Sequence, residues 1–268
     1  MAGASKPRTV PTKQQRIAEL AGQGPEMGFT SLAYFIDINW LSQAYHRTRK
    51  DGAVGVDGQT AEAYAVDLEG NLQSLLDRAK SGTYKAPPVR RAHIPKAGSP
   101  GETRPPGIPT FEDQVLQRAV VMVLEPLDEQ DFLDCSYGFR PGRSAHRALE
   151  ALWQQTMTTG GGWISDVDIR KFFDTIDPGH LWACLKRRVR DGVRLRLIGQ
   201  GLHAGVLEDG CLAHPEAGSP QGGVLSPLLS NLFLHSVLDR WFASEVRPRL
   251  KGKSFLIRDA DDRHGLCS

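Results

Sequence analysis

The 268-residue sequence has no apolar run long enough to cross a membrane, so it predicts no membrane partner. It has only four cysteines and no Cys-x-x-Cys pair, which argues against a disulfide framework and a thiolate metal site. We therefore expect reduced cysteines in a cytoplasmic protein. The polar, basic N-terminus lacks the apolar core of a secretory signal, and residues 1–28 are expected to form a disordered basic arm.

An excess of positive charge is also missing, because the net charge is only +2 and does not by itself predict a nucleic-acid partner. Basic residues are nonetheless clustered in three places near apolar segments. Solvated helix and loop faces explain any single cluster, whereas three clusters leave a phosphate-binding surface as an open alternative. The clusters are Arg90, Arg91, Lys96 and Arg104; Arg140, Arg143 and Arg147; and Lys186, Arg187, Arg188 and Arg190.

Helix starts are marked by capping residues. Thr110-Phe111-Glu112-Asp113 is a capping box, Ser144 is a capping residue, and Asp177-Pro178 and Ser226-Pro227 place proline at the first helical position. Strands and helices alternate irregularly, without a βαβ rhythm, which indicates an α+β fold. Helices are expected over 32–49, 60–80, 110 to about 125, from 144, from 177 and over 228–246, and strands over 89–94, 163–169 and 255–257.

Two strands each end in carboxylates. Asp166 and Asp168 share one face of the strand over 163–169, whose other face carries Val167 and Ile169. A carboxylate in such an apolar strand is costly unless it is exposed, paired or bound to a metal ion. We interpret Asp177, farther along, as a helix cap, but Asp168 is a candidate metal ligand.

The stretch FLIRDADD, residues 255–262, leads a second apolar strand into Asp259, Asp261 and Asp262. A solvated acidic turn is one interpretation. Alternatively, two strands that deliver carboxylates together form an oxygen-lined site of the kind that Mg²⁺ prefers. Two ions about 4 Å apart would activate an attacking hydroxyl and stabilise the leaving oxygen of a phosphoryl transfer.

The stretch GSPQGGVLSPLLSN, residues 218–231, combines glycines with a helix start. Gly222 allows close approach of the backbone to a substrate, and Gln221 offers both a donor and an acceptor. The helix N-terminus that follows favours phosphate. An ordinary glycine-rich loop before a core helix is the alternative.

Taken together, these segments resemble motifs A, B and C of reverse transcriptases, in the variant used by group II intron-encoded proteins. Upstream segments agree with this resemblance, which covers roughly residues 45–262. They are GVDG at 55–58, PVRRAHIPK at 88–96, RPPGIPTFEDQVLQRAV at 104–120 and SYGFRPGRSAH at 136–146.

The resemblance implies a right-hand polymerase with fingers over 29–162, including an N-terminal helical extension, and an incomplete palm over 163–268, whose antiparallel sheet packs on helices. It implies a magnesium-dependent RNA-directed DNA polymerase that takes an intron RNA template, a DNA primer and deoxynucleoside triphosphates. The resemblance implies three sets of site residues. The catalytic residues that bind two Mg²⁺ ions are Asp168, Asp261 and Asp262. The nucleotide is bound by Lys96, Arg104, Phe173, Gln221 and Gly222, of which Phe173 excludes a ribose 2′-hydroxyl, and nucleic acid is bound by Arg90, Arg91, Arg140 and Arg143.

Three departures from the family pattern lead to further expectations. Asp259 replaces a tyrosine and adds a negative charge near the primer end. The residues after Asp262 do not follow the family's apolar second strand, so the strand over 255–257 is expected to lack a partner, as in a frame-disrupted product. With the thumb and maturase domains also absent, we expect a truncated enzyme with weak or no activity; the alternative is a non-catalytic RNA-binding or maturase-type fragment.

Overall fold

The computed structural model describes residues 9–95, 103–160, 163–169, 172–213, 222–260 and 262–267. The chain divides into two compact units. The first unit contains Met1–Gln130, Lys186–Glu216 and Pro220–Leu225, and the second contains Asp131–Leu185, Ala217–Ser219 and Ser226–Ser268. This division does not follow the expected boundary between residues 162 and 163, and the assignment of fingers and palm stays a prediction.

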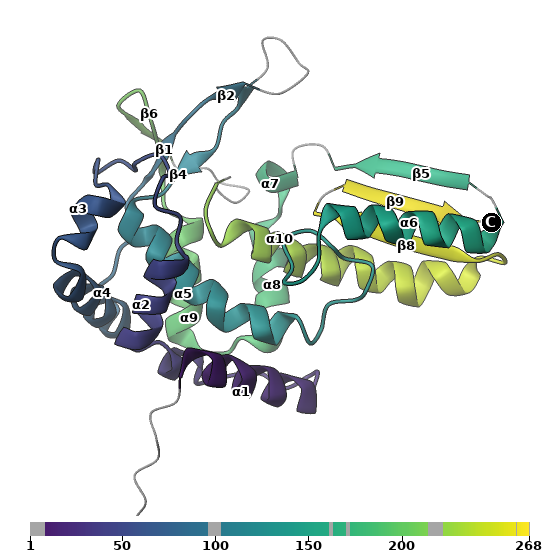
Figure 1. The fold of residues 1–268 in the computed structure, drawn as a ribbon, viewed down its shortest axis with the longest axis horizontal. Coiled ribbons are helices and arrows are strands. Elements are labelled where there is room, and N and C mark those ends of the chain that lie inside the picture. Colours follow the sequence, from purple (N-terminus) through teal and green to yellow (C-terminus); the bar gives the residue numbers. More distant parts are fainter. Residues whose placement is uncertain are drawn as a thin grey trace, which may run out of the picture. The chain divides into compact units, whose positions relative to one another are not determined.

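The first unit is built around helix α5 (Phe111–Asp128), which is buried along most of its length. Thr110 caps this helix as predicted, because its hydroxyl accepts a hydrogen bond from the backbone N–H of Asp113. Helices α1 and α2 pack against α5, as Figure 1 shows. The other helical elements of this unit are α1 (Val10–Gln23), a 3₁₀ turn (Leu32–Phe35), α2 (Ile38–Arg47), α3 (Ala61–Ala65), α4 (Leu68–Ser81) and α9 (Gly192–Leu202).

Two small sheets complete the first unit. The larger has the order β4-β1-β6-β7, in which β1 and β6 are parallel and the other pairs antiparallel. The smaller is the antiparallel pair β2-β3. The strands are β1 (Val89–Arg91), β2 (Ile94–Pro95), β3 (Thr103–Arg104), β4 (Gly107–Ile108), β6 (Val206–Glu208) and β7 (Cys211–Ala213).

The second unit holds an antiparallel sheet of order β5-β9-β8 that packs on helices (Figure 1). Its strands are β5 (Trp163–Asp168), β8 (Ser254–Asp259) and β9 (Asp262–Cys267). Its helices are α6 (Ala145–Thr159), α7 (Phe172–Thr175) and α10 (Ser226–Leu234), which continues in π-helical turns over His235–Asp239 and Phe242–Val246 and a 3₁₀ turn over Arg247–Arg249. Helix α8 (Pro178–Arg188) connects the two units along the chain. The predicted α+β class is confirmed.

The expected disorder of residues 1–28 is wrong for Val10–Gln23, which form helix α1. The hydroxyl of Thr9 accepts from the N–H of Thr12, and Pro11 lies in the first turn, where proline favours a helix start. Val10, Ile17 and Ala21 are buried, and the helix packs on α5. Packing of one apolar face therefore orders a segment whose composition is polar.

Two expectations about the strands of the second unit are also wrong. Strand β8 has a partner, because the residues after Asp262 form β9, and β9 hydrogen-bonds to both β8 and β5. Ladder hydrogen bonds come from the backbone, so β9 needs no alternation of apolar side chains. The apolar face expected for β5 is exposed, with Trp163 at 86% and Val167 at 47%, because β5 is an edge strand and α6 packs mainly on β8.

No helix among the residues that the structure describes has the length and apolar character needed to cross a membrane.

Candidate functional site

Three aspartates form a row across the sheet of the second unit. Asp168 on β5 lies directly opposite Asp262 on β9, and Asp262 lies directly opposite Asp259 on β8. Residues directly opposite one another share a face of the sheet, so Asp168 and Asp259 lie on the same face. At a strand spacing of about 4.8 Å, their backbones are about 10 Å apart. The structure thus brings together residues 168 and 262, which are 94 positions apart in the sequence and opposite each other in the strand register.

The chemistry of this row fits a divalent cation. Carboxylate oxygens are the ligands that Mg²⁺ prefers, and the exposed Asp168 can reach a hydrated ion. Because Asp168 is exposed, the predicted cost of burying its carboxylate is absent, and the strand register is what points to a shared site. Asp261 and the side chain of Asp262 lie outside the described residues. Among the described side chains, no group of three or more His, Cys, Asp or Glu is placed to hold a metal ion.

The turn between β8 and β9 is held by the loop of the second unit that contains Gly138. Ala260 adopts a left-handed backbone with φ of 57°. A Cβ atom on Gly138 would lie 2.3 Å from the backbone nitrogen of Ala260 and 2.5 Å from Oδ1 of Asp259. Only a glycine at position 138 therefore lets the loop approach the turn this closely.

Arg140 and Arg143 both hold that loop together. Arg140 is buried, and its Nη1 donates to the carbonyls of Leu133 and Ser136 at 2.8 and 2.9 Å. Arg143 donates to the carboxylate and the carbonyl of Asp134. Their contact with nucleic acid stays a prediction, and for Arg140 the burial of its guanidinium counts against it.

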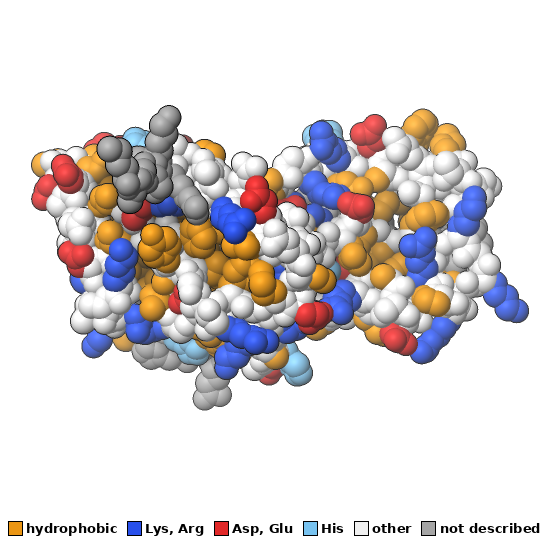
Figure 2. Space-filling view, turned by 90° about the horizontal axis from the view of Figure 1, so that it is seen from below, with side chains coloured by type: hydrophobic (Ala, Val, Ile, Leu, Met, Phe, Trp, Pro, Cys, Tyr) orange, Lys and Arg blue, Asp and Glu red, His pale blue; other side chains and the backbone are white. Residues whose placement is uncertain are grey.

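The other predicted binding residues are half-buried or lie, wholly or with their side chains, outside the described residues. Arg90 donates to the carbonyl of Val54, and Arg91 donates to that of Pro105, both at 2.9 Å. Lys96 and Gln221 lie outside the described residues, as do the side chains of Arg104 on β3 and Phe173 on α7. On the face in Figure 2, Lys and Arg side chains are scattered, with Asp and Glu among them.

Gly222 is the one predicted nucleotide-binding residue whose conformation is fully described. It has φ of 100°, and a Cβ atom there would lie 2.6 Å from the carbonyl oxygen of Gly107. The glycine therefore packs against the start of β4. The predicted need for close backbone approach holds here, but the partner that the structure shows is protein backbone.

Sequence reasoning missed the most buried polar group near the turn. Arg258, in the middle of FLIRDADD, is 0% exposed and pairs with Asp239, whose side chain is also fully buried. An arginine inside an apolar strand was the available signal. Nearby, burial and then the carboxylate of Asp239 raise the pKa of the Cys135 thiol to about 12, so this thiol is neutral at ordinary pH.

Comparisons with known proteins identify the family. The family profile described as reverse transcriptase (RNA-dependent DNA polymerase) matches residues 94–264. Protein YkfC of Escherichia coli (strain K12) is 37% identical over 267 residues, which cover 92% of this chain and 69% of that protein. The group II intron-encoded protein LtrA of Lactococcus lactis subsp. cremoris is 35% identical over 227 residues, which cover 83% of this chain but only 37% of LtrA.

A solved structure supports the fold. The chain superposes on part of a Cas6-RT-Cas1–Cas2 complex with a TM-score of 0.53 and 24% identity, covering 89% of this chain and 38% of that one. The chain belongs to the reverse transcriptase (RNA-dependent DNA polymerase) family. Within that family it is of the group II intron-encoded reverse transcriptase and maturase kind, as the resemblance implied. Members act on a nucleic-acid template with nucleotide substrates and generally use a divalent metal ion.

Proposed function

We propose that this chain carries the catalytic core of an RNA-directed DNA polymerase of a group II intron. The observation that carries the proposal is the register that sets Asp168 opposite Asp262 at the turn. Intron RNA is the template, a DNA 3′ end is the primer and deoxynucleoside triphosphates are the substrates.

Asp168, Asp261 and Asp262 are the proposed ligands of two Mg²⁺ ions. When bound, such ions activate the primer hydroxyl and neutralise charge on the transferred phosphate. The protein's contribution is to hold the carboxylates on adjacent strands, where ladder hydrogen bonds fix their spacing. A backbone ladder changes little during turnover, so the donor positions are organised before the substrate arrives.

The remaining proposed roles concern the nucleotide and the nucleic acid. Lys96 and Arg104 bind the triphosphate, and Phe173 excludes a ribose 2′-hydroxyl. Gln221 and Gly222 lie against the incoming nucleotide. Arg90 and Arg91, on β1, contact the phosphates of the template, because both residues are only partly buried beside their carbonyl partners. For Arg91 this contact competes with an ion pair, since its Nε lies 3.6 Å from the carboxylate of Glu208.

Primer extension on an RNA template tests the proposal. Asp168→Ala should lower the rate at least about 100-fold, because each metal ligand supports several kcal/mol of transition-state stabilisation. Asp166→Ala is the matched control, since Asp166 lies two residues earlier on the same strand and face. Equal rates for the wild type and Asp168→Ala would refute the catalytic assignment.

A non-catalytic RNA-binding fragment of maturase type is the second candidate. Asp259 favours this second candidate, because its carboxylate lies in the same row as Asp168 and would repel the phosphates of a primer. Binding of structured RNA should then weaken steeply with rising salt, and it should survive Asp168→Ala. Affinity that does not change between low and high salt would exclude this function.

A further inference from the structure

A buried hydrogen-bond network lies directly behind the turn that carries the aspartates. The guanidinium of Arg258 makes five hydrogen bonds. Its Nε and Nη2 donate to the two oxygens of Asp239 at 3.0 and 2.8 Å, a bidentate pair. The remaining three bonds go to Oδ1 of Asn231 (2.8 Å), Oγ of Ser136 (2.8 Å) and the carbonyl oxygen of Ala260 (2.9 Å).

The backbone of Arg258 is fixed as well. Its N–H donates to the carbonyl of Cys135 at 2.7 Å, and its carbonyl accepts from the N–H of Tyr137 at 2.8 Å. Asn231 turns its amide the other way and donates to the carbonyl of Gly138 at 2.7 Å. One arginine thus joins strand β8, the loop over 135–138 and the helix that begins as α10.

The contact that matters for function is the one to Ala260. This residue lies between Asp259 and Asp261, and its left-handed φ of 57° is unfavourable for an alanine by roughly 1 kcal/mol. The Arg258 bond holds the carbonyl of this strained residue, while Gly138 lies against its nitrogen. Any movement of Ala260 moves the neighbouring aspartates with it.

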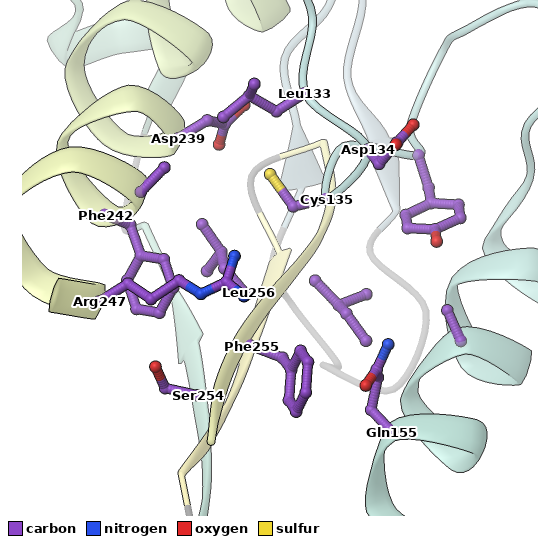
Figure 3. Close-up of a pocket in the computed structure, with 14 residues that line it drawn as sticks. Leu133, Asp134, Cys135, Gln155, Asp239, Phe242, Arg247, Ser254, Phe255 and Leu256 are labelled. Atoms are coloured by element: carbon purple, nitrogen blue, oxygen red, sulfur yellow. The ribbon is translucent and has the colours of Figure 1, made fainter. Parts of the chain in front are cut away.

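Strand β8 borders open space just before Arg258. A pocket of about 360 Å³ borders the strand, and its lining includes Ser254–Ile257, Cys135 and Asp239 (Figure 3). Apolar side chains next to open space give a strand little positional restraint. A buried ion pair adds little net stability over an apolar filling, but only a donor can hold the carbonyl of Ala260.

We propose that Arg258, oriented by Asp239 and Asn231, is a positioning residue that sets where the aspartates of the turn stand and thereby sets the affinity of the site for its metal ions. It touches neither substrate nor metal. This inference rests on the proposed function, because it assumes that Asp168, Asp261 and Asp262 form the metal site. Groups that orient metal ligands typically change metal affinity 10- to 100-fold when they are altered.

The test is a titration of the full chain with Mn²⁺ in the absence of nucleic acid. Electron paramagnetic resonance measures how much Mn²⁺ is bound. Arg258→Lys keeps the charge but removes the bidentate geometry, and it should weaken Mn²⁺ binding about 10-fold. Arg194→Lys is the matched control, because Arg194 is also buried, at 1% exposure, and donates to the carbonyl of Leu32 in the first unit. It should lower the melting temperature and leave Mn²⁺ affinity unchanged.

Milder variants decide the question if Arg258→Lys does not fold. Ser136→Ala removes one bond to the guanidinium and should weaken Mn²⁺ binding about 3-fold at an unchanged stoichiometry, as expected for one hydrogen bond of modest strength. If folded Arg258→Lys binds Mn²⁺ with wild-type affinity, the inference is overturned. If Arg258→Lys does not fold, wild-type Mn²⁺ affinity in Ser136→Ala overturns it. Mn²⁺ binding that survives Asp168→Asn would instead overturn the site itself, so the two failures are distinguishable.

Discussion

The phenol of Tyr84 donates a 2.8 Å hydrogen bond to Oδ1 of Asp113 in the core of the first unit. Gln117 donates to the other carboxylate oxygen at 2.9 Å. Burial raises the pKa of Asp113 to about 6, and the two hydrogen bonds only partly oppose this shift. Burial also raises the pKa of Tyr84, so the phenol stays protonated as the donor.

This pair predicts a loss of stability as the pH rises. Between about pH 4 and pH 6 the native protein binds more protons at Asp113 than the unfolded chain does, so the free energy of unfolding falls as pH rises, by at most about 3 kcal/mol. Asp113→Asn should remove this component. Urea unfolding of both proteins at several pH values measures it. Parallel stability curves for the two proteins would show that Asp113 has an ordinary pKa.

Trp40 provides a prediction about the packing of α2 on α5. Its indole N–H donates to the carbonyl of Ala119 at 2.9 Å, and the residue is fully buried. Trp40→Phe removes the donor and leaves a gap, which should cost about 2 kcal/mol of unfolding free energy. Trp241→Phe is the control, because Trp241 is 53% exposed and should change stability by less than about 0.5 kcal/mol. Similar losses in both variants would contradict the assigned role.

Gly222 allows the backbone restriction in its loop to be tested directly. Gly222→Ala should destabilise the chain by more than about 1 kcal/mol, because φ is 100° and the new methyl group would meet the carbonyl of Gly107. Gly192→Ala is the comparison, since open space surrounds that position at the start of α9. Thermal melts of the two variants should differ. If Gly222→Ala melts like the wild type, the loop has another conformation.

Asp259 is expected to weaken primer binding by charge repulsion. A unit charge about 6 Å from a phosphate costs up to about 3 kcal/mol at an effective dielectric constant near 20. Asp259→Asn removes the charge at constant size, and Asp259→Tyr restores the residue that is usual in the family. Both should lower the KM for primer in the extension assay. A higher KM in both variants would mean that the carboxylate assists the site.

The local parts of the fold were predictable because their signals lie within a few residues. Thr110 and Ser144 cap helices as their sequence contexts indicate, since each hydroxyl accepts from a backbone N–H three residues on. Helix α5 runs to Asp128, slightly past the predicted end before Pro126. The predicted helix over 32–49 breaks into a 3₁₀ turn and α2, because Asp37 caps a new start.

The nonlocal parts were not predictable from spacing. The segment RHGLC of β9 has no strand pattern, and its pairing depends on β5, almost a hundred residues earlier. The Arg258 network likewise joins Ser136, Asn231 and Asp239, which are distant in sequence. For Asp168 and Asp262, the family resemblance supplied what periodicity could not. The strand register sets the two residues opposite each other, and their metal-binding role stays a prediction.

The sheet order β5-β9-β8 has a consequence for the sequence of folding events. Strands β8 and β9 are joined by a tight turn and can pair quickly, whereas β5 must close a loop of more than 90 residues to reach β9. Asp168 is therefore expected to reach the turn after the hairpin has formed. Substitutions in β9 should slow refolding of the second unit by weakening the edge on which β5 docks. The row of Asp168, Asp262 and Asp259 is then expected to be the last part of this sheet to assemble.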